Sequence, residues 1–331
     1  MVRSAFLAIA VTAVLSGSAA AQTQRTKAIY TASAAGAYHT SFCPPIPAAM
    51  EQAGFHGYAC TPSGGTPDNI AKVLADPRSL GFAQLDVLAR WALDNFAVAK
   101  KLVLIRTLAC EGLWMVTREK NMAAVYFGQI VGHAKRLQFA VADGGSRASF
   151  EFLQKIDPNG LGRARNVDFV KNATDAIELV AMERADVGFF VQFVEPSNPN
   201  IRLLYERNLR TLPIVNPELI AATVSGTPVY QVQNFNLSEW SGMSAGTQLT
   251  TTCTPAVIVT GAPESIADPE DADNQRALLS KIKAAPDSAF LPKDGRLARL
   301  ISSSRKVPGP ELKDMLAAYD AAKRKAEASA P

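Results

Sequence analysis

The chain has 331 residues, of which 48% are hydrophobic and 19% charged, and its formal net charge is +4 at pH 7. A small basic excess spread along the chain excludes the basic patches of a nucleic-acid-binding protein. The length is enough for two domains, or for one large domain with a substantial core.

The first 21 residues have the order of features that is typical of a signal peptide. Arg3 provides a positive charge, residues 5–15 are apolar apart from Thr12, and residues 19–21 are alanines that fit a cleavage site. The apolar run is shorter than the roughly 20 residues that span a bilayer. We therefore expect export to the periplasm and a mature chain that begins at Gln22, without a lipid anchor because no cysteine follows the site.

After this segment, short apolar runs alternate with helical patterns. Strands are predicted at residues 28–31, 58–60, 80–83, 102–108 and 113–117, with helices at 47–53, 66–74 and 86–95. The pattern then repeats with strands at 137–142, 167–170 and 186–191 and helices at 149–156 and 175–184. This repetition predicts an α/β fold of two doubly wound lobes. Residues 196–250 show no clear pattern; strands at 250–253 and 257–260 and helices near 270–285 and 311–328 follow.

Small and polar residues follow several of the predicted strands. In open α/β sheets, ligands bind beyond the carboxyl ends of the strands. Turns of this kind occupy residues 33–38, 63–68 and 144–147, and Gln84 directly follows a strand. Thr66 is a suitable N-cap residue for the following helix, and Pro67 suits the first helical position. One such turn by itself only caps a helix in most proteins, but four in both halves of the chain favour a cleft between two lobes.

These turns define the predicted ligand site. Its members are Ser33, Gly36, Tyr38, Gly65, Thr66 and Gln84 from the first lobe, and Ser146, Arg147 and Gln192 from the second. Gln192 is included because it ends the strand at residues 186–191. Arg147 has the guanidinium geometry for a bidentate contact with a carboxylate, although a solvent-exposed arginine in a first helical turn is an equal alternative.

Sequence signals for catalysis are weak. Residues 242–246 fit the G-x-S-x-G pattern of a nucleophile, but they lack the preceding strand and following helix that the motif needs. His39, His56 and His133 have no metal-ligand spacing. We therefore predict no catalytic residue, metal or cofactor. An enzyme built on the same two-lobed fold, and a sensory module for a membrane receptor, remain the alternatives.

The order of the turns resembles the TAXI-type solute-binding subunits of TRAP transporters, which have the type II periplasmic binding-protein fold. Residues 33–38 are similar to that family's first turn ending in Tyr, residues 63–70 to its glycine turn before a helix with Asn, and residues 81–87 to its Gln-x-Asp segment. Gly144-Gly145-Ser146 is similar to its second-lobe turn, with Arg147 in place of the usual Gly.

The resemblance implies a protein that captures a small organic anion or amino-acid-like ligand and passes it to membrane permease subunits. We expect this protein to be a monomer. It also implies two segments that cross between the lobes as a hinge. We place the first lobe at residues 22–112 and 253–331, and the second at 113–252.

An even number of cysteines in an exported chain favours two disulfides, and four cysteines allow three pairings. Because the resemblance puts the crossings near residues 110 and 253, we expect Cys110–Cys253 at the hinge and Cys43–Cys60 within the first lobe. Four buried free thiols are the alternative.

Overall fold

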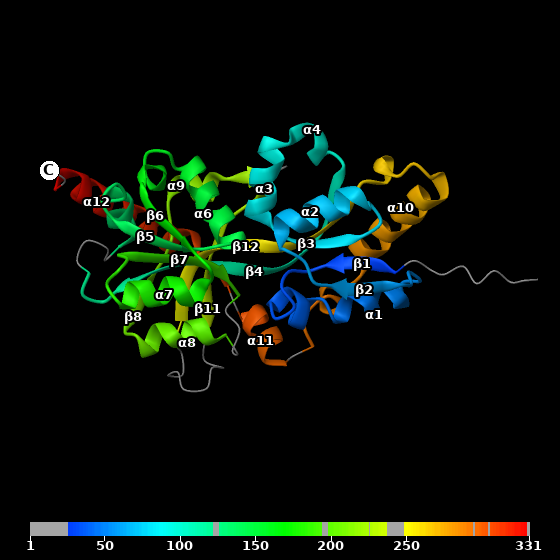
Figure 1. Cartoon of the computed structure of the whole chain (residues 1–331), viewed down its shortest axis with the longest axis horizontal. Coiled ribbons are helices and arrows are strands. Elements are labelled where there is room, and N and C mark those ends of the chain that lie inside the picture. Colours follow the sequence, from blue (N-terminus) through cyan, green and yellow to red (C-terminus); the bar gives the residue numbers. More distant parts are fainter. Residues whose placement is uncertain are drawn as a thin grey trace, which may run out of the picture.

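The computed structural model describes residues 26–121, 126–193, 198–224, 226–236, 248–293, 295–303 and 305–329. The predicted signal peptide and the motif at residues 242–246 lie outside these ranges. Two α/β lobes lie side by side, as Figure 1 shows, with the first at the right and the second at the left. The predicted α/β fold of two lobes is confirmed. In the part of the chain described, no helix has the length and apolar character needed to cross a membrane.

The first lobe is built around three parallel strands in the order β2-β1-β3. They are β1 (Lys27–Tyr30), β2 (Tyr58–Thr61) and β3 (Leu80–Gln84). Between and after them come the π-helical turn η1 (Tyr38–Phe42) and the helices α1 (Pro45–Gln52), α2 (Thr66–Ala75), α3 (Leu85–Asp94) and α4 (Phe96–Ala99). β3 is buried along its whole length, because helices cover it on both sides, as is typical of parallel sheets.

The second lobe repeats this plan with the parallel strands β6-β5-β7. The strands are β5 (Gln138–Ala142), β6 (Asn166–Val170) and β7 (Val187–Gln192). The helices are α5 (Phe127–Gly132), α6 (Gly145–Ile156), α7 (Ala173–Ala181) and α8 (Pro199–Glu206), with the short 3₁₀ turn η3 (Leu161–Arg163). Phe139, Phe150 and Phe189 are fully buried in its core.

The segment that had no clear sequence pattern adds short elements to the second lobe. They are β8 (Leu209–Leu212), α9 (Pro217–Ala221), β9 (Thr223–Val224), β10 (Thr227–Pro228) and β11 (Gln231–Asn236). Within the described residues, β9 and β10 form a separate two-stranded sheet. β8 pairs with the second half of the crossing strand described next.

Two long antiparallel strands cross between the lobes: β4 (Leu102–Arg118) and β12 (Gln248–Gly261). We predicted each of them as two separate strands. The structure makes each continuous, because the residues between the predicted halves pair across the crossing, with Cys110 opposite Pro255 and Gly112 opposite Cys253. β12 also pairs with β3 and β4 also pairs with β7. One sheet therefore runs through both lobes.

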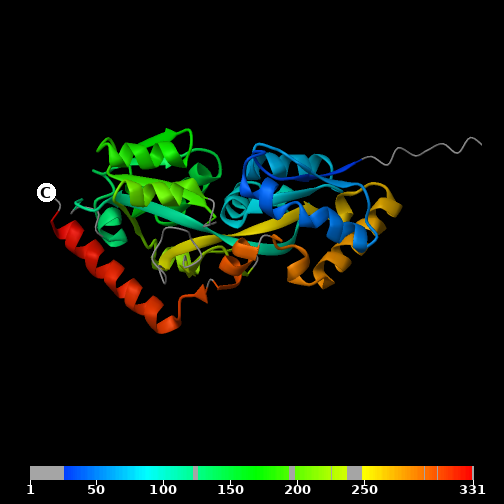
Figure 2. The same cartoon turned by 90° about the horizontal axis from the view of Figure 1, so that it is seen from below.

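The C-terminal segments run from the first lobe to the second, along the lower side of the molecule in Figure 2. They are η4 (Pro263–Ser265), α10 (Pro269–Ala284), η5 (Asp287–Ala289), α11 (Gly295–Ser303), β13 (Arg305–Lys306) and α12 (Gly309–Ala328). α10 packs on the first lobe, where Asp271 pairs with Arg78 at 2.9 Å.

The last helix, α12, packs on α5 of the second lobe. The ring of Tyr319 stacks on Phe127 with 5.8 Å between ring centroids, and Gly128 and Gly132 let the two helices approach closely. Our assignment of residues 253–331 as a whole to the first lobe is therefore wrong for this helix. Its amphipathic pattern indicated a helix, but not which lobe would cover its apolar face.

Candidate ligand-binding cleft

A cleft of about 900 Å³ lies between the lobes, with residues of both lobes in its walls. Eight of the nine predicted site residues line it: Ser33, Gly36, Tyr38, Gly65, Thr66, Gln84, Ser146 and Gln192. Sequence reasoning missed several other lining residues, chiefly Glu111, Lys171, Asn172, Phe193, Asn198 and Asn200. Its volume is in the range of small-molecule sites.

The two walls are built on matching glycine turns. Gly65 precedes α2 with φ of 91°, and Gly144 precedes α6 with φ of 71°. Backbone angles in this left-handed region favour glycine. Each turn brings the first N–H groups of its helix to the cleft, and α7 begins there too, with Asn172 as its N-cap. Helix N-termini favour negative groups because their N–H donors have no partner within the helix.

A matching pair of hydroxyls ties each turn to the end of a strand. The Thr66 Oγ1 accepts a hydrogen bond from the Gln84 N–H at 3.0 Å, and the Ser146 Oγ accepts one from the Val191 N–H at 2.9 Å. We expected Thr66 to cap its own helix, but Gly65 holds the N-cap position and Thr66 is the first helical residue. Since each hydroxyl has only one hydrogen, that hydrogen is what it offers to a ligand.

Glu111 lies at the floor of the cleft, in the middle of β4. Its side chain is buried, and the Tyr38 hydroxyl donates to its Oε2 at 2.7 Å. Burial is the largest influence and raises the pKa of Glu111 to about 7, and the nearby Asp86 adds to this rise. Hydrogen bonds from Tyr38 and Gln84 oppose the rise by stabilising the carboxylate.

Aromatic rings hold Tyr38 in this position. Its ring stacks on Phe82 at 4.9 Å and meets the edge of Phe193 at 5.8 Å. Phe193, which follows β7, also stacks on Phe42 at 4.5 Å. An aromatic side chain of the second lobe therefore completes the packing around a first-lobe residue of the cleft.

The lobes also touch beside the cleft. A Cβ on Gly145 would overlap the Gln84 Oε1, so these two residues of opposite lobes are in close contact. Helices α3 and α6 are joined by two ion pairs, Arg90 with Glu151, and Lys155 with Asp94 at 2.7 Å. These contacts hold the lobes together in the arrangement described.

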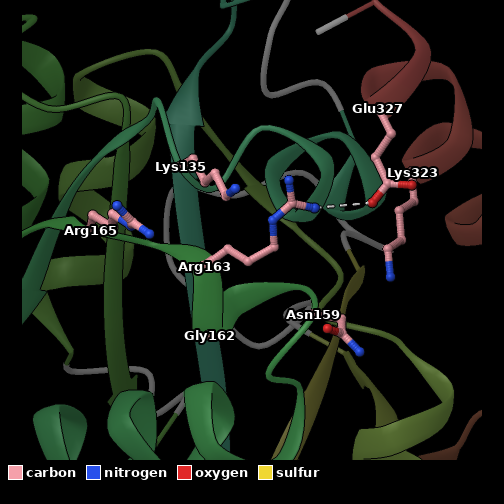
Figure 3. Close-up of a pocket in the computed structure, with 7 residues that line it drawn as sticks. All are labelled: Lys135, Asn159, Gly162, Arg163, Arg165, Lys323 and Glu327. Carbon is pink, nitrogen blue, oxygen red and sulfur yellow. Dashed lines mark hydrogen bonds and ion pairs between the residues drawn. The ribbon is translucent and has the colours of Figure 1, made fainter.

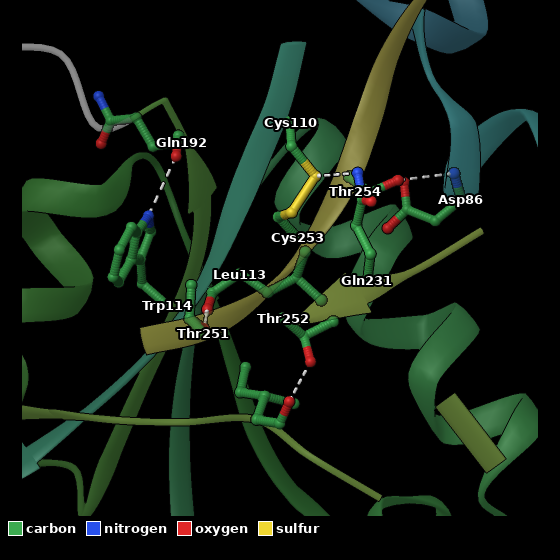
Figure 4. The surroundings of a disulfide bond; sticks show 11 residues. Asp86, Cys110, Leu113, Trp114, Gln192, Gln231, Thr251, Thr252, Cys253 and Thr254 are labelled. Atoms are coloured by element: carbon green, nitrogen blue, oxygen red, sulfur yellow. Dashed lines mark hydrogen bonds between the residues drawn. A yellow bond between two sulfur atoms is a disulfide. The ribbon is translucent and has the colours of Figure 1, made fainter. Parts of the chain in front are cut away.

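Polar groups of α8 fix the second-lobe wall. The Asn200 amide donates to the Gln192 Oε1 at 2.9 Å, and Asn198 caps the helix through the Asn200 N–H at 2.9 Å. The Gln192 carbonyl accepts from the Trp114 indole N–H at 3.0 Å (Figure 4). Hydrogen bonds to its side chain and to its carbonyl thus fix the position of Gln192 in the cleft wall.

Arg147 does not line the cleft. Its Nε donates to Glu151 at 2.9 Å, a guanidinium nitrogen lies 3.9 Å from Asp143, and the group stacks over the Phe169 ring at 4.1 Å. We predicted that it contacts a ligand, but in this structure acids four residues before and after it on α6 pair with its guanidinium instead. Among the described residues that line the cleft, Lys171 is the only basic one.

Both predicted disulfides are confirmed. Cys43 and Cys60 are joined with their Cα atoms 6.0 Å apart, and Cys110 and Cys253 with theirs 5.5 Å apart. The second bridge joins the two crossing strands at mid-length (Figure 4), next to Glu111. Gln231 donates to Cys110 Sγ at 3.3 Å. The floor of the cleft is therefore covalently fixed.

A second concavity, of about 520 Å³, lies where α12 meets the second lobe (Figure 3). It is lined by Lys135, Asn159, Gly162, Arg163, Arg165, Lys323 and Glu327. Arg163 and Glu327 form an ion pair across it at 3.3 Å. It contains none of the predicted site residues. Among the described residues, no group of three or more His, Cys, Asp or Glu side chains could hold a metal ion.

No protein-family model matches the sequence, and no curated protein matches it. Solved structures align with most of the chain. One, described as a periplasmic transporter, is 12% identical over 91% of this chain and 95% of its own, with a TM-score of 0.46. The MatC protein of Rhodopseudomonas palustris with bound malate is 16% identical over 92% and 99%, with a TM-score of 0.45.

A third structure is a binding-protein component of an ABC phosphonate transporter from Pseudomonas aeruginosa. It is 13% identical over 92% of this chain and 97% of its own, with a TM-score of 0.42. At such low identities and TM-scores, we base no functional conclusion on these similarities.

Proposed function

We propose that this chain is an extracytoplasmic solute-binding protein, which holds a small polar, anionic organic ligand between its lobes and delivers it to a membrane transporter. The observation that carries the proposal is the cleft of about 900 Å³, whose walls are matching helix starts from two lobes. The N–H groups of these helix starts suit an acidic group of a ligand.

The crossing strands give the mechanism. A ligand that contacts both walls stabilises the closed arrangement, because it interacts with both lobes only when they are close together. Small dihedral changes in β4 and β12 beyond the Cys110–Cys253 bridge would let the lobes separate. Ligand capture and release would then be a rotation about this hinge.

The finer assignments belong to the same proposal. The ligand contacts are Ser33, Gly36, Tyr38, Gly65, Thr66, Gln84, Ser146 and Gln192. The order of the turns supports a TAXI-type subunit of a TRAP transporter, working as a monomer in the periplasm after removal of residues 1–21. The protein binds its solute without changing it.

Small molecules released from the purified, denatured protein test this proposal. Mass spectrometry should find one organic compound in near-stoichiometric amount. That compound should bind again to the refolded or ligand-free protein in calorimetry, and it should be recovered unchanged. Recovery of a chemically altered compound would favour an enzyme. A purified protein that yields no compound and is not stabilised by a broad pool of small organic acids would contradict the proposal.

A further inference from the structure

We propose that the solute carries a protonated nitrogen, which pairs with the Glu111 carboxylate at the floor of the cleft, in addition to an acidic group that faces the helix starts. The ligand class is then an amino-acid-like zwitterion rather than a simple organic acid. This inference rests on the proposed solute-binding function and specifies which solutes the same cleft accepts.

Glu111 is a buried acid that reaches the cleft. Its side chain lies in the cleft lining, yet only 7% of the residue is exposed. The uncharged side chains of Tyr38 and Gln84 donate hydrogen bonds to it, and among the described residues it forms no ion pair. A buried carboxylate without a positive partner is costly. A cationic nitrogen of the ligand would supply that partner.

The side chains around Glu111 are acidic or uncharged. The groups that face it are Tyr38 from η1 and Asp86 from the start of α3, with the uncharged Gln84 beside them. Asp86 is fully buried and receives hydrogen bonds from the Tyr230 hydroxyl at 3.0 Å and the Val87 N–H at 2.8 Å. The floor therefore holds two acids, and no base faces Glu111 there among the described residues.

The floor and the walls of the cleft favour ligand groups of opposite charge. On the far wall, Asp143 and Lys171 are both exposed, so solvent screens their charges. The starts of α2, α6 and α7 lie around the same space and favour a negative group. The acidic floor suits a positive group and the helix starts in the walls suit a negative group, so one zwitterionic ligand would satisfy both.

The pairing makes binding depend on pH in a defined direction. An ammonium group binds the ionised form of Glu111, whose pKa in the ligand-free protein is about 7. The ionised fraction rises from about one tenth at pH 6 to about nine tenths at pH 8, so affinity should rise about tenfold over this range. A ligand that has an acidic group but no amine would prefer the protonated form of Glu111, so its affinity would fall about tenfold from pH 6 to pH 8.

The experiment compares two matched sets of probes on the full mature chain at pH 6 and pH 8. One set is aspartate, glutamate, alanine, leucine and phenylalanine. The other replaces the amine with hydrogen, giving succinate, glutarate, propionate, 4-methylpentanoate and 3-phenylpropionate. Thermal stabilisation identifies any binder, and calorimetry then gives its Kd. We expect a member of the amine set to bind more tightly than its counterpart, and more tightly at pH 8.

Glu111→Gln should remove both the preference for the amine and the pH dependence. Glu119→Gln changes an exposed acid directly after the C-terminal end of β4. It is the matched control and should leave both the preference and the pH dependence unchanged. If Glu111→Gln does not fold, the pH profile of the unaltered protein decides alone. Tighter binding of the amine-free set, greater affinity at pH 6, or no binding by either set would overturn the assignment. In each of these cases, a small organic compound released on denaturation would leave the solute-binding function standing.

Discussion

The bridge between Cys110 and Cys253 offers the sharpest test of how the crossing strands stabilise the molecule. Replacing both cysteines with alanine removes a link between residues 143 apart in sequence, whereas the Cys43–Cys60 bridge links residues 17 apart. A disulfide limits the conformations of the unfolded chain, and the limit is stronger for longer loops. The two double variants remove the same atoms, so comparing them isolates loop length.

The loop-closure relation gives about 5 kcal/mol for the longer loop and about 3 kcal/mol for the shorter one. We therefore expect the Cys110→Ala, Cys253→Ala protein to lose about 2 kcal/mol more unfolding free energy than the Cys43→Ala, Cys60→Ala protein. The crossing strands pair from Leu102 opposite Gly261 to Gly112 opposite Cys253, and we expect this pairing to remain in both variants. The difference should thus come from the unfolded chain.

Urea unfolding, followed by circular dichroism and by tryptophan fluorescence, measures the two losses. Coincident transitions by the two signals justify a single unfolding free energy for this two-lobed protein, and unchanged m-values allow midpoints to be compared. An equal or greater loss in the Cys43→Ala, Cys60→Ala protein would refute the loop-length reasoning. It would show that local packing around the first-lobe bridge dominates.

Three further predictions concern the cleft. The pKa of Glu111 is raised from 4.5 to about 7 in the folded protein. Between pH 4.5 and about pH 7 the folded state therefore keeps a proton that the unfolded state loses, and stability falls as pH rises through this range. Glu111→Gln should therefore stabilise the ligand-free protein by up to about 3 kcal/mol at pH 8, and unfolding curves that show it destabilised there would contradict this. Gly145→Ala should weaken binding of the co-purified solute in calorimetry, because the added Cβ would overlap Gln84 of the other lobe. Gly309→Ala, where a Cβ has open space, is the control and should leave affinity unchanged. Equal affinities of the two variants would contradict a role of the Gly145–Gln84 contact in binding. Arg147→Ala should leave solute affinity unchanged since its guanidinium already pairs with Glu151, and a clear loss would return it to the site.

The alternation of strands and helices could be predicted from the sequence because each buried strand is a short apolar run between turns. Leu80–Gln84 and Val187–Gln192 are examples. The continuity of β4 and β12 could not, because Glu111, Gly112 and Pro255 interrupt their apolar pattern. Only the partner strand makes those positions extended. The packing of α12 on the second lobe likewise depends on a partner distant in sequence.

Some residues of the candidate site could likewise be predicted from the sequence, and others could not. The glycine turns follow from local rules, since strand ends and helix starts are visible in the sequence. The strand-end rule would also have found Lys171 and Asn172, which directly follow β6. The acids at positions 143 and 151, four residues either side of Arg147, were a readable signal against a ligand contact. Glu111 had no local signal, because its burial comes from Tyr38 and the opposite strand.

The position of β12 has a consequence for the order in which the chain can assemble. β12 lies between β3 and β4, yet it is contributed by residues 248–261. A chain that emerges from its N-terminus therefore completes the β6-β5-β7 sheet while the edge of β3 still lacks its neighbour. An unpaired edge of this kind is prone to pair with other chains. The first lobe begins first and finishes last, so one edge of its sheet stays open until residue 261 has appeared.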